Sequence, residues 1–216
     1  MKQKTTTSPL AVGITGGIGS GKTAAAHMFG SLGARVLYAD RIASDLINSR
    51  LEIKKRIRET FGERVILQDG TLDRKAMSRL VFTDDGLKEK LDAIVHPRVL
   101  ESIADEIARF KRSAKGAIIM IEAALLYEAR AEGFFDYVIV VDAPEDERIA
   151  RIMARDHSTR AEVLQRIKAQ LPAESKVARA DFVIRNSGDL RLLEKNCKFV
   201  HRILIDLACG NRASGA

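Results

Sequence analysis

The apolar positions of the chain fall into five short runs that are rich in β-branched residues. Near-continuous apolar runs of this length are typical of parallel strands that are buried on both faces, and helical patterns separate them. The sequence therefore predicts an α/β fold, a doubly wound five-stranded parallel sheet with helices on both faces. The expected strands are Leu10–Thr15, Arg35–Tyr38, Ala117–Glu122, Tyr137–Asp142 and Phe182–Arg185.

Local signals place several of the helices. The first runs from Lys22 to Leu32 and ends at Gly33, a residue typical of helix C-termini. Asp69-Gly70 marks a turn, and Asp73 is suited to cap a helix over 74–82. After Pro97, apolar residues recur at helical spacing and predict an amphipathic helix. A last helix is expected over 190–208, with Cys197 in its core.

The spacing between the predicted strands is uneven. A long, mainly helical segment separates the second strand from the third, between Asp40 and Gly116. An insertion after the second strand is expected beside the carboxyl ends of the strands, where α/β folds bind ligands. It is the natural place for a second substrate.

The first strand leads into a glycine-rich loop and then into a helix. Gly16, four further residues and Gly21-Lys22-Thr23 satisfy the phosphate-binding pattern G-x-x-x-x-G-K-[ST]. Glycines let backbone N–H groups face a triphosphate, Lys22 can reach its β- and γ-phosphates, and the Thr23 hydroxyl can ligate magnesium. This motif predicts a nucleotide-phosphate site with magnesium, and the expected binding residues are Gly17, Ile18, Gly19, Ser20, Gly21, Lys22, Thr23 and Ala24.

Asp40 follows the second predicted strand almost directly. A carboxylate at that end can orient and deprotonate an attacking hydroxyl group, which is the task of the base in a phosphotransferase. A helix cap for Ile42 onward is the equal alternative. Two other acids end strands, Glu122 and Asp142, and either is suited to hold magnesium.

Arginines gather beyond the fourth predicted strand. Arg148, Arg151 and Arg155 are spaced to share one helical face, and Arg160 and Arg166 follow a polar break at 156–159. We interpret this helix-break-helix segment as a mobile lid that brings guanidinium groups onto the transferring phosphoryl group and excludes water. A solvated basic face, partly neutralised by acids at 145–147, is the alternative.

Composition narrows the class of protein. The 216 residues are 46% hydrophobic and 30% charged, and no apolar run is long enough to span a membrane. The net charge of +7 comes from 36 basic residues interleaved with 29 acidic ones, which suits polyphosphate substrates better than nucleic acid. The two cysteines are too few for a disulfide framework. We expect a cytoplasmic protein with no membrane or nucleic-acid partner; the oligomeric state stays open.

An ordered set of motifs resembles the dephospho-coenzyme A kinase family. It extends from the loop at 13–23 to about Asp189. Its other members are the runs 38–43, 61–62, 69–74, 94–97, 122–128, 151–156, 166–170 and 180–186. The loop alone is generic, but this ordered set is specific.

The resemblance implies transfer of the γ-phosphoryl group of MgATP to the ribose 3′-hydroxyl of dephospho-coenzyme A, the last step of coenzyme A synthesis. It implies a nucleotide core (1–40, 116–145 and 181–216), a helical coenzyme A domain (41–115) and a lid (146–180). On that pattern Asp40 is the base, Lys22 holds the triphosphate, and Arg151 and Arg155 touch phosphates. Asn186 lies near the adenine, and the acceptor site includes Arg74, His96, Pro97, Leu125 and Glu128.

The chain departs from the family pattern at a few positions. Tyr38 stands where the family usually has Asp, Ser44 where it often has His, and Ala124 where it usually has Pro. Arg148 stands for a usual Gln, and Thr23-Ala24 for Ser-Thr. The changes at Ser44 and Ala124 affect the acceptor side, and no residue that the chemistry requires is missing.

Other functions compete with this interpretation. A nucleoside or nucleoside monophosphate kinase shares the loop and the lid but needs a smaller acceptor site. A GTPase or regulatory ATPase is disfavoured because the chain lacks the Asn-Lys-x-Asp guanine signature. A nucleic-acid-binding protein that also binds ATP would show tight, salt-dependent binding to DNA or RNA.

Overall fold

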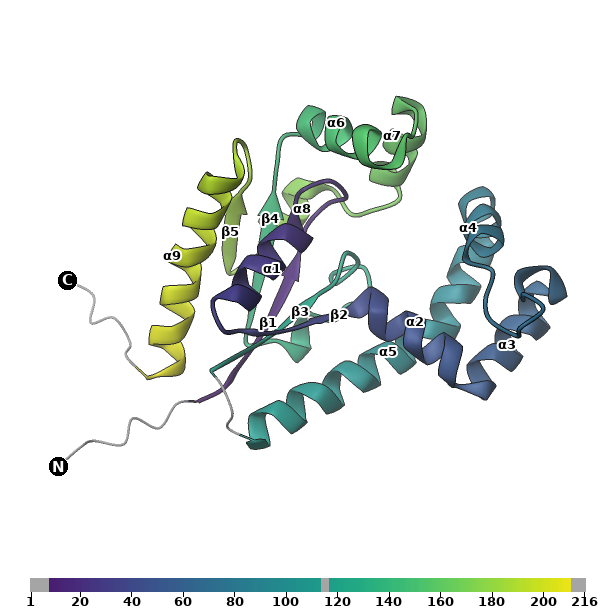
Figure 1. Cartoon of the computed structure of the whole chain (residues 1–216), viewed down its shortest axis with the longest axis horizontal. Helices are drawn as coiled ribbons and strands as arrows, with labels where there is room; N and C mark the ends of the chain where they lie inside the picture. Colours follow the sequence, from purple (N-terminus) through teal and green to yellow (C-terminus); the bar gives the residue numbers. More distant parts are fainter. Residues whose placement is uncertain (1–7, 114–116, 211–216) are drawn as a thin grey trace. The chain divides into compact units, whose positions relative to one another are not determined.

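A computed structural model gives the fold of the chain (Figure 1). It describes residues 8–113 and 117–210, and within these ranges five strands form one sheet in the order β2-β3-β1-β4-β5. Every pairing is parallel. The strands are β1 (Leu10–Thr15), β2 (Arg35–Tyr38), β3 (Ile118–Glu122), β4 (Tyr137–Asp142) and β5 (Phe182–Arg185). The predicted sheet is confirmed, with one change: Ala117 precedes β3 instead of opening it.

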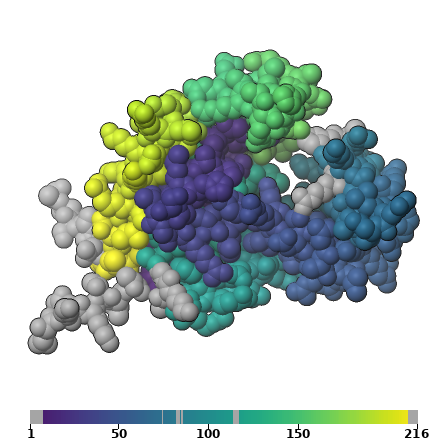
Figure 2. Space-filling model, viewed as in Figure 1, coloured from purple at the N-terminus to yellow at the C-terminus, as the bar shows by residue number. Residues whose placement is uncertain are grey.

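One face of the sheet packs against the helices α1 (Lys22–Ser31) and α9 (Leu190–Ala208). Val12 and Ile14 of β1 point into this layer and meet Phe29 of α1 and Leu204 of α9, all of which are fully buried. Figure 2 shows the yellow surface of α9 alongside the purple surface of α1. This apolar layer fixes α1, and with it the loop that joins α1 to β1.

The described residues divide into two compact units. One unit comprises the described residues up to Tyr38 and from Glu106 onward, and it contains the sheet. The other, Ala39–Asp105, is helical. Its elements are α2 (Ala39–Ser49), α3 (Leu51–Phe61), a 3-10 turn (Glu63–Val65), α4 (Arg74–Thr83) and the first part of α5 (Asp85–Ser113).

Several of the predicted helix signals are confirmed. Gly33 follows α1 with a φ of 101°, a conformation that glycine adopts without strain. Asp73 caps α4 by accepting hydrogen bonds from the backbone N–H groups of Lys75 and Ala76, both at 3.0 Å. The last helix has its expected bounds, and Cys197 is fully buried in it.

The amphipathic helix predicted after Pro97 is confirmed, and its apolar positions Val99, Ile103, Ile107 and Phe110 are buried, but the helix is longer than the segment after the proline. α5 starts twelve residues earlier, at Asp85, and runs through the proline to Ser113. A proline inside a helix removes one backbone hydrogen bond. Buried side chains on both sides of the proline, Ile94 and Val95 before it and Val99 after it, hold the flanking turns in place.

Beyond β4, the chain of the sheet unit forms three short helices before it returns to β5. They are α6 (Glu145–Asp156), α7 (Arg160–Lys168) and α8 (Ala173–Val177). The predicted helix-break-helix pattern is present: His157 adopts a left-handed conformation with φ 53°, and Thr159 caps α7. A further 3-10 turn, Glu132–Phe134, lies between β3 and β4.

Candidate active site

The phosphate loop leaves the carboxyl end of β1 and enters α1 at Lys22. Gly21 precedes the helix with a φ of 91°, and a Cβ atom there would lie only 2.3 Å from the Asn186 side-chain nitrogen. Gly16 has a φ of 156°, and a Cβ there would lie 2.2 Å from the Val141 carbonyl oxygen. Both positions therefore require glycine, for conformation and for space.

The start of α1 is suited to bind an anion. No side chain caps the helix, and its first-turn residues Lys22, Thr23 and Ala24 include no acid. The first N–H groups of a helix have no partner within the helix, and the helix dipole adds partial positive charge there. This loop and helix end form a typical phosphate site.

Lys22 lies next to the carboxyl end of the neighbouring strand β3. Its Nζ atom is 3.9 Å from Oε1 of Glu122, which is only 6% exposed. The sheet register causes this proximity, since Glu122 pairs with Ile14 of β1. Of the two acids considered for magnesium, Asp142 instead pairs with Arg185 of β5. Glu122 is thus the carboxylate beside the lysine of the loop.

Asn186, which directly follows β5, binds the backbone of the phosphate loop. Its side chain is 7% exposed, and its amide nitrogen donates a hydrogen bond of 2.7 Å to the Ser20 carbonyl oxygen. The resemblance implies a contact of Asn186 with adenine, which stays a prediction. The contact that the structure shows is the hydrogen bond between Asn186 and the backbone of the loop.

The arginines of α6 do not all lie on a solvent-exposed face of the helix. Arg148 is 5% exposed, and its Nε donates to the Ile18 carbonyl oxygen at 3.0 Å. Arg151 donates to the Asn186 carbonyl oxygen at 3.1 Å and to Glu147 at 2.7 Å, and its Nη1 lies 3.5 Å from the Gly19 carbonyl oxygen. In Figure 2 the green surface of α6 and α7 abuts the purple surface of the phosphate loop and α1. Arg148 and Arg151 thus contact the loop directly.

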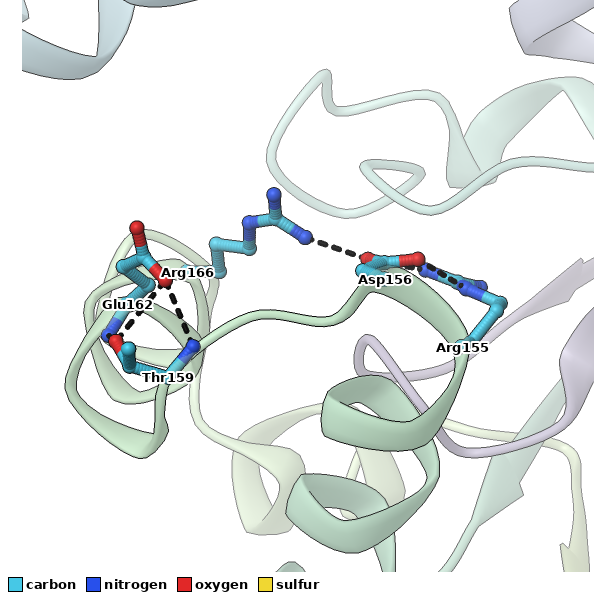
Figure 3. A network of polar contacts seen from close by, with 5 residues as sticks. All are labelled: Arg155, Asp156, Thr159, Glu162 and Arg166. Atoms are coloured by element: carbon cyan, nitrogen blue, oxygen red, sulfur yellow. Dashed lines mark hydrogen bonds and ion pairs between the residues drawn. The ribbon is translucent and has the colours of Figure 1, made fainter.

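Arg155 lies at the break between α6 and α7 (Figure 3). It donates to Asp156 at 2.7 and 3.0 Å, and Arg166 reaches the same carboxylate at 2.7 Å. Hydrogen bonds from Arg155, followed by those from Arg166, lower the pKa of Asp156 to about 2. Across the break, Thr159 and Glu162 form a reciprocal cap at the start of α7. The role of Arg155 toward phosphate stays a prediction.

The loop after β3 carries Leu125 and Glu128. Leu125 is half-buried, and its carbonyl oxygen accepts a hydrogen bond from the Ala129 N–H group at 2.9 Å. Glu128 accepts from the Leu171 backbone N–H group at 2.9 Å and lies 2.8 Å from Nζ of the fully buried Lys176. Its second oxygen, Oε2, is buried and has no hydrogen-bond partner among the residues described. Contact of Leu125 and Glu128 with the acceptor stays a prediction.

The remaining predicted residues belong to the helical unit. Asp40 is exposed and is the second residue of α2, so it lies inside the helix and does not precede it as a cap. His96 Nε2 lies 3.4 Å from an oxygen of Asp92. Arg74 is the first residue of α4, and its side chain lies outside what the structure describes.

The helical unit contains a cavity of about 340 Å³ beside Asp40. Asp40 and Ser44 of α2 line one part of it, and Leu72 and Met77 line another. The lining is mainly apolar, with the carboxylate of Asp40 among its polar groups. Such a cavity suits an elongated, partly apolar ligand.

Several contacts of the site could not be predicted from the sequence, although Gln170 belongs to the run 166–170 that resembles the family. Gln170 accepts a hydrogen bond from the Ile18 N–H group at 2.9 Å, although it follows α7 and is far from the loop along the chain. Lys176 has the sequence context of an ordinary surface lysine, yet its side chain is fully buried. The helical spacing of Arg148 placed it beside Arg151, but spacing alone does not reveal that it contacts the loop.

Comparisons with known proteins agree with this geometry. The sequence profile of the family described as dephospho-CoA kinase matches residues 10–191. A dephospho-CoA kinase from Nitrosospira multiformis is 39% identical over 203 residues, which cover 94% of this chain and 100% of that protein.

Two solved structures are also similar. One, from Thermus thermophilus, has a TM-score of 0.75 and 38% identity, and the match covers 91% of this chain and 98% of that one. The dephospho-CoA kinase from Campylobacter jejuni has a TM-score of 0.69 and 26% identity, with 93% and 98% covered. The chain belongs to the dephospho-CoA kinase family.

Proposed function

We propose that this protein transfers the γ-phosphoryl group of ATP to the ribose 3′-hydroxyl of dephospho-coenzyme A, which gives coenzyme A and ADP. This is the final step of coenzyme A biosynthesis. Membership of the family supports the reaction. The observation that carries it is the phosphate loop, in which Lys22 lies beside a buried carboxylate at the uncapped start of α1.

The loop residues 17–24 are proposed to bind the triphosphate. Backbone N–H groups at the start of α1 donate to its oxygens, and Lys22 stabilises the charge that develops on the transferring group. Because Glu122 is 3.9 Å from Lys22, it holds the ammonium group near the loop before the nucleotide arrives.

The residues present fit a magnesium ion. Carboxylate and hydroxyl oxygens are the ligands that Mg²⁺ prefers. The loop offers the Thr23 hydroxyl, and the buried Glu122 has its Oε1 3.9 Å from Nζ of the adjacent Lys22. We propose that these two side chains hold the ion. Bound there, magnesium would neutralise charge on the β- and γ-phosphates.

Asp40 is proposed as the base that takes the proton of the acceptor hydroxyl. Arg151 and Arg155 are proposed to contact phosphates during transfer. On this view the Arg151 contacts with Gly19 and Asn186 keep its guanidinium near the loop, while Arg155 leaves Asp156 when phosphate binds. The lid is the interval 146–180.

The helical interval 41–115 is proposed to bind the coenzyme A acceptor. The apolar cavity beside Asp40 supports this assignment, because it offers space for an elongated ligand next to the proposed base. Arg74, His96, Pro97, Leu125 and Glu128 complete the proposed acceptor site.

A cytoplasmic enzyme with small-molecule substrates and no nucleic-acid or membrane partner is proposed. Of the helices in residues 8–113 and 117–210, none combines the length and apolar character needed to span a bilayer.

Coupled ADP release tests the proposal. The protein is supplied with MgATP and either dephospho-coenzyme A or a panel of nucleoside monophosphates. Fast turnover with dephospho-coenzyme A alone is the expected result. Turnover with a monophosphate instead would retain kinase chemistry but reject the acceptor, and ADP release independent of any acceptor would make the protein an ATPase.

A further inference from the structure

Ile18, in the middle of the phosphate loop, is held at three points by the helical segment beyond β4. Its N–H group donates to Oε1 of Gln170 at 2.9 Å. Its carbonyl oxygen accepts from Nε of Arg148 at 3.0 Å. Its side chain packs against the apolar cluster of α6 and α7, which consists of Ile149, Ile152 and Val163 with Leu164 and Ile167.

The two polar contacts come from different ends of this segment. Arg148 lies in the first turns of α6, whereas Gln170 follows the last turn of α7. A single residue of the loop therefore joins both helices. Gln170 and Ile18 are 152 positions apart along the chain, so the contact between them exists only in the folded protein.

The Ile18 N–H group depends on this acceptor. It lies in a partly buried place, and a buried donor that loses its acceptor is costly. Without the Gln170 oxygen, the loop would turn the Ile18 N–H group toward another acceptor or water. Either change moves the neighbouring residues, Gly19 and Ser20, which belong to the phosphate-binding pattern.

We propose that Gln170 is a positioning residue that sets the phosphate loop for the triphosphate and couples the loop to α6 and α7. Nucleotide bound to the loop then reduces the mobility of α6 and α7. By the same coupling, less mobile α6 and α7 favour nucleotide binding. The inference rests on the proposed function only in its choice of ATP as the ligand.

The experiment compares Gln170→Leu with Gln165→Leu. Gln165 is an exposed residue of α7, so the second variant makes the same chemical change away from the loop. Binding of a non-hydrolysable ATP analogue with magnesium is measured without acceptor, so the result does not depend on which acceptor is phosphorylated. We expect Gln170→Leu to weaken binding about tenfold, the size of one lost hydrogen bond with its unsatisfied donor, and Gln165→Leu to bind as the wild type does.

Amide hydrogen exchange resolved by residue gives the second measurement. In the wild type, the Ile18 amide should exchange slowly, and the nucleotide analogue should further protect α7. Gln170→Leu should lose both effects, whereas Gln170→Glu keeps an acceptor oxygen of equal reach and should keep the Ile18 protection.

Each of the two measurements has an outcome that would overturn the proposal. An Ile18 amide that exchanges freely in the wild type would remove its basis even if the leucine variant did not fold. Wild-type analogue affinity in Gln170→Leu, or an unchanged response of α7 to the nucleotide in that variant, would reject the coupling. Failure to phosphorylate dephospho-coenzyme A would instead reject only the proposed acceptor.

Discussion

The ammonium group of Lys176, which is fully buried in α8, lies 2.8 Å from the carboxylate of Glu128 in the loop after β3. It also donates to the Ala124 carbonyl oxygen at 3.1 Å. The Thr15 hydroxyl at the end of β1 donates to that same oxygen at 3.4 Å. These contacts connect α8 to the carboxyl end of β1, where the phosphate loop begins.

Lys176→Met should destabilise the protein strongly. The substitution keeps most of the apolar volume but leaves Glu128 without its cation, and breaking one side of a buried pair costs about 3–5 kcal/mol. The free energy of unfolding from urea titration measures the effect. Lys198→Met removes the exposed pair with Glu194 and should cost about 0.5 kcal/mol or less.

A double variant separates the ion pair from packing. Lys176→Met combined with Glu128→Leu removes both charges, so no unpaired charge remains. The double variant should be more stable than the sum of the two single changes. Additive losses would show that the two side chains do not interact in solution.

The sequence suffices to predict the sheet, because its signals are local. β-Branched runs mark all five predicted strands, and Gly33 and Asp73 carry the helix-end chemistry that the structure contains. The phosphate loop is equally local, since Gly16 to Thr23 contain all of its essential groups.

Long-range contacts could not be predicted in this way. Arg148 has the spacing of a solvated helix residue, and only the packing of α6 against the loop buries it. Gln170 and Lys176 meet partners that are far away in sequence. The register of β1 against β3 places Glu122 beside Lys22, and one sequence does not reveal register.

Tertiary packing overrides a local rule at Pro97. Pro97 usually ends a helix, yet α5 continues through it. Buried apolar contacts of the flanking turns outweigh the lost hydrogen bond, so tertiary packing decides the length of this helix.

Asp156 should make stability depend on pH in the acidic range. Hydrogen bonds from Arg155 and then Arg166 lower its pKa to about 2, from an ordinary value of 3.8. The stabilisation is therefore complete above about pH 4 and is lost as the pH falls toward 2. The gap in melting temperature between wild type and Asp156→Asn should be larger at pH 5 than at pH 3. A gap that is constant with pH would remove the charged contact as its cause.

Lys22→Ala should impair the chemical step. Lys22 is the cation beside the uncapped start of α1, and removal of one donor that stabilises developing charge typically costs about 3 kcal/mol of transition-state energy. Turnover at saturating MgATP should fall by about two to three powers of ten. Lys195→Ala, on the exposed side of α9, is the matched control. Turnover like that of the wild type in Lys22→Ala would contradict the assignment of the loop.

Asp40→Asn tests the proposed base. The substitution keeps the size and one oxygen of the side chain but removes its ability to take a proton at neutral pH. Turnover should fall by about two to four powers of ten, the usual contribution of a general base, while ATP affinity stays near that of the wild type. Kinetics at saturating MgATP, with ATP affinity from equilibrium binding, separates the two quantities.

Asp45→Asn provides the control for this change, because Asp45 is also an exposed acid of α2 but does not line the cavity beside Asp40. It should turn over at the wild-type rate. If Asp40→Asn also did so, the proton of the acceptor would have to leave by another route and Asp40 would keep only its place in the first turn of α2, where a negative charge favours the helix. A loss of ATP affinity in Asp40→Asn that accounts for the whole loss of rate would instead make the residue a ligand of the nucleotide. Only a fall in turnover with unchanged ATP affinity assigns Asp40 to proton transfer.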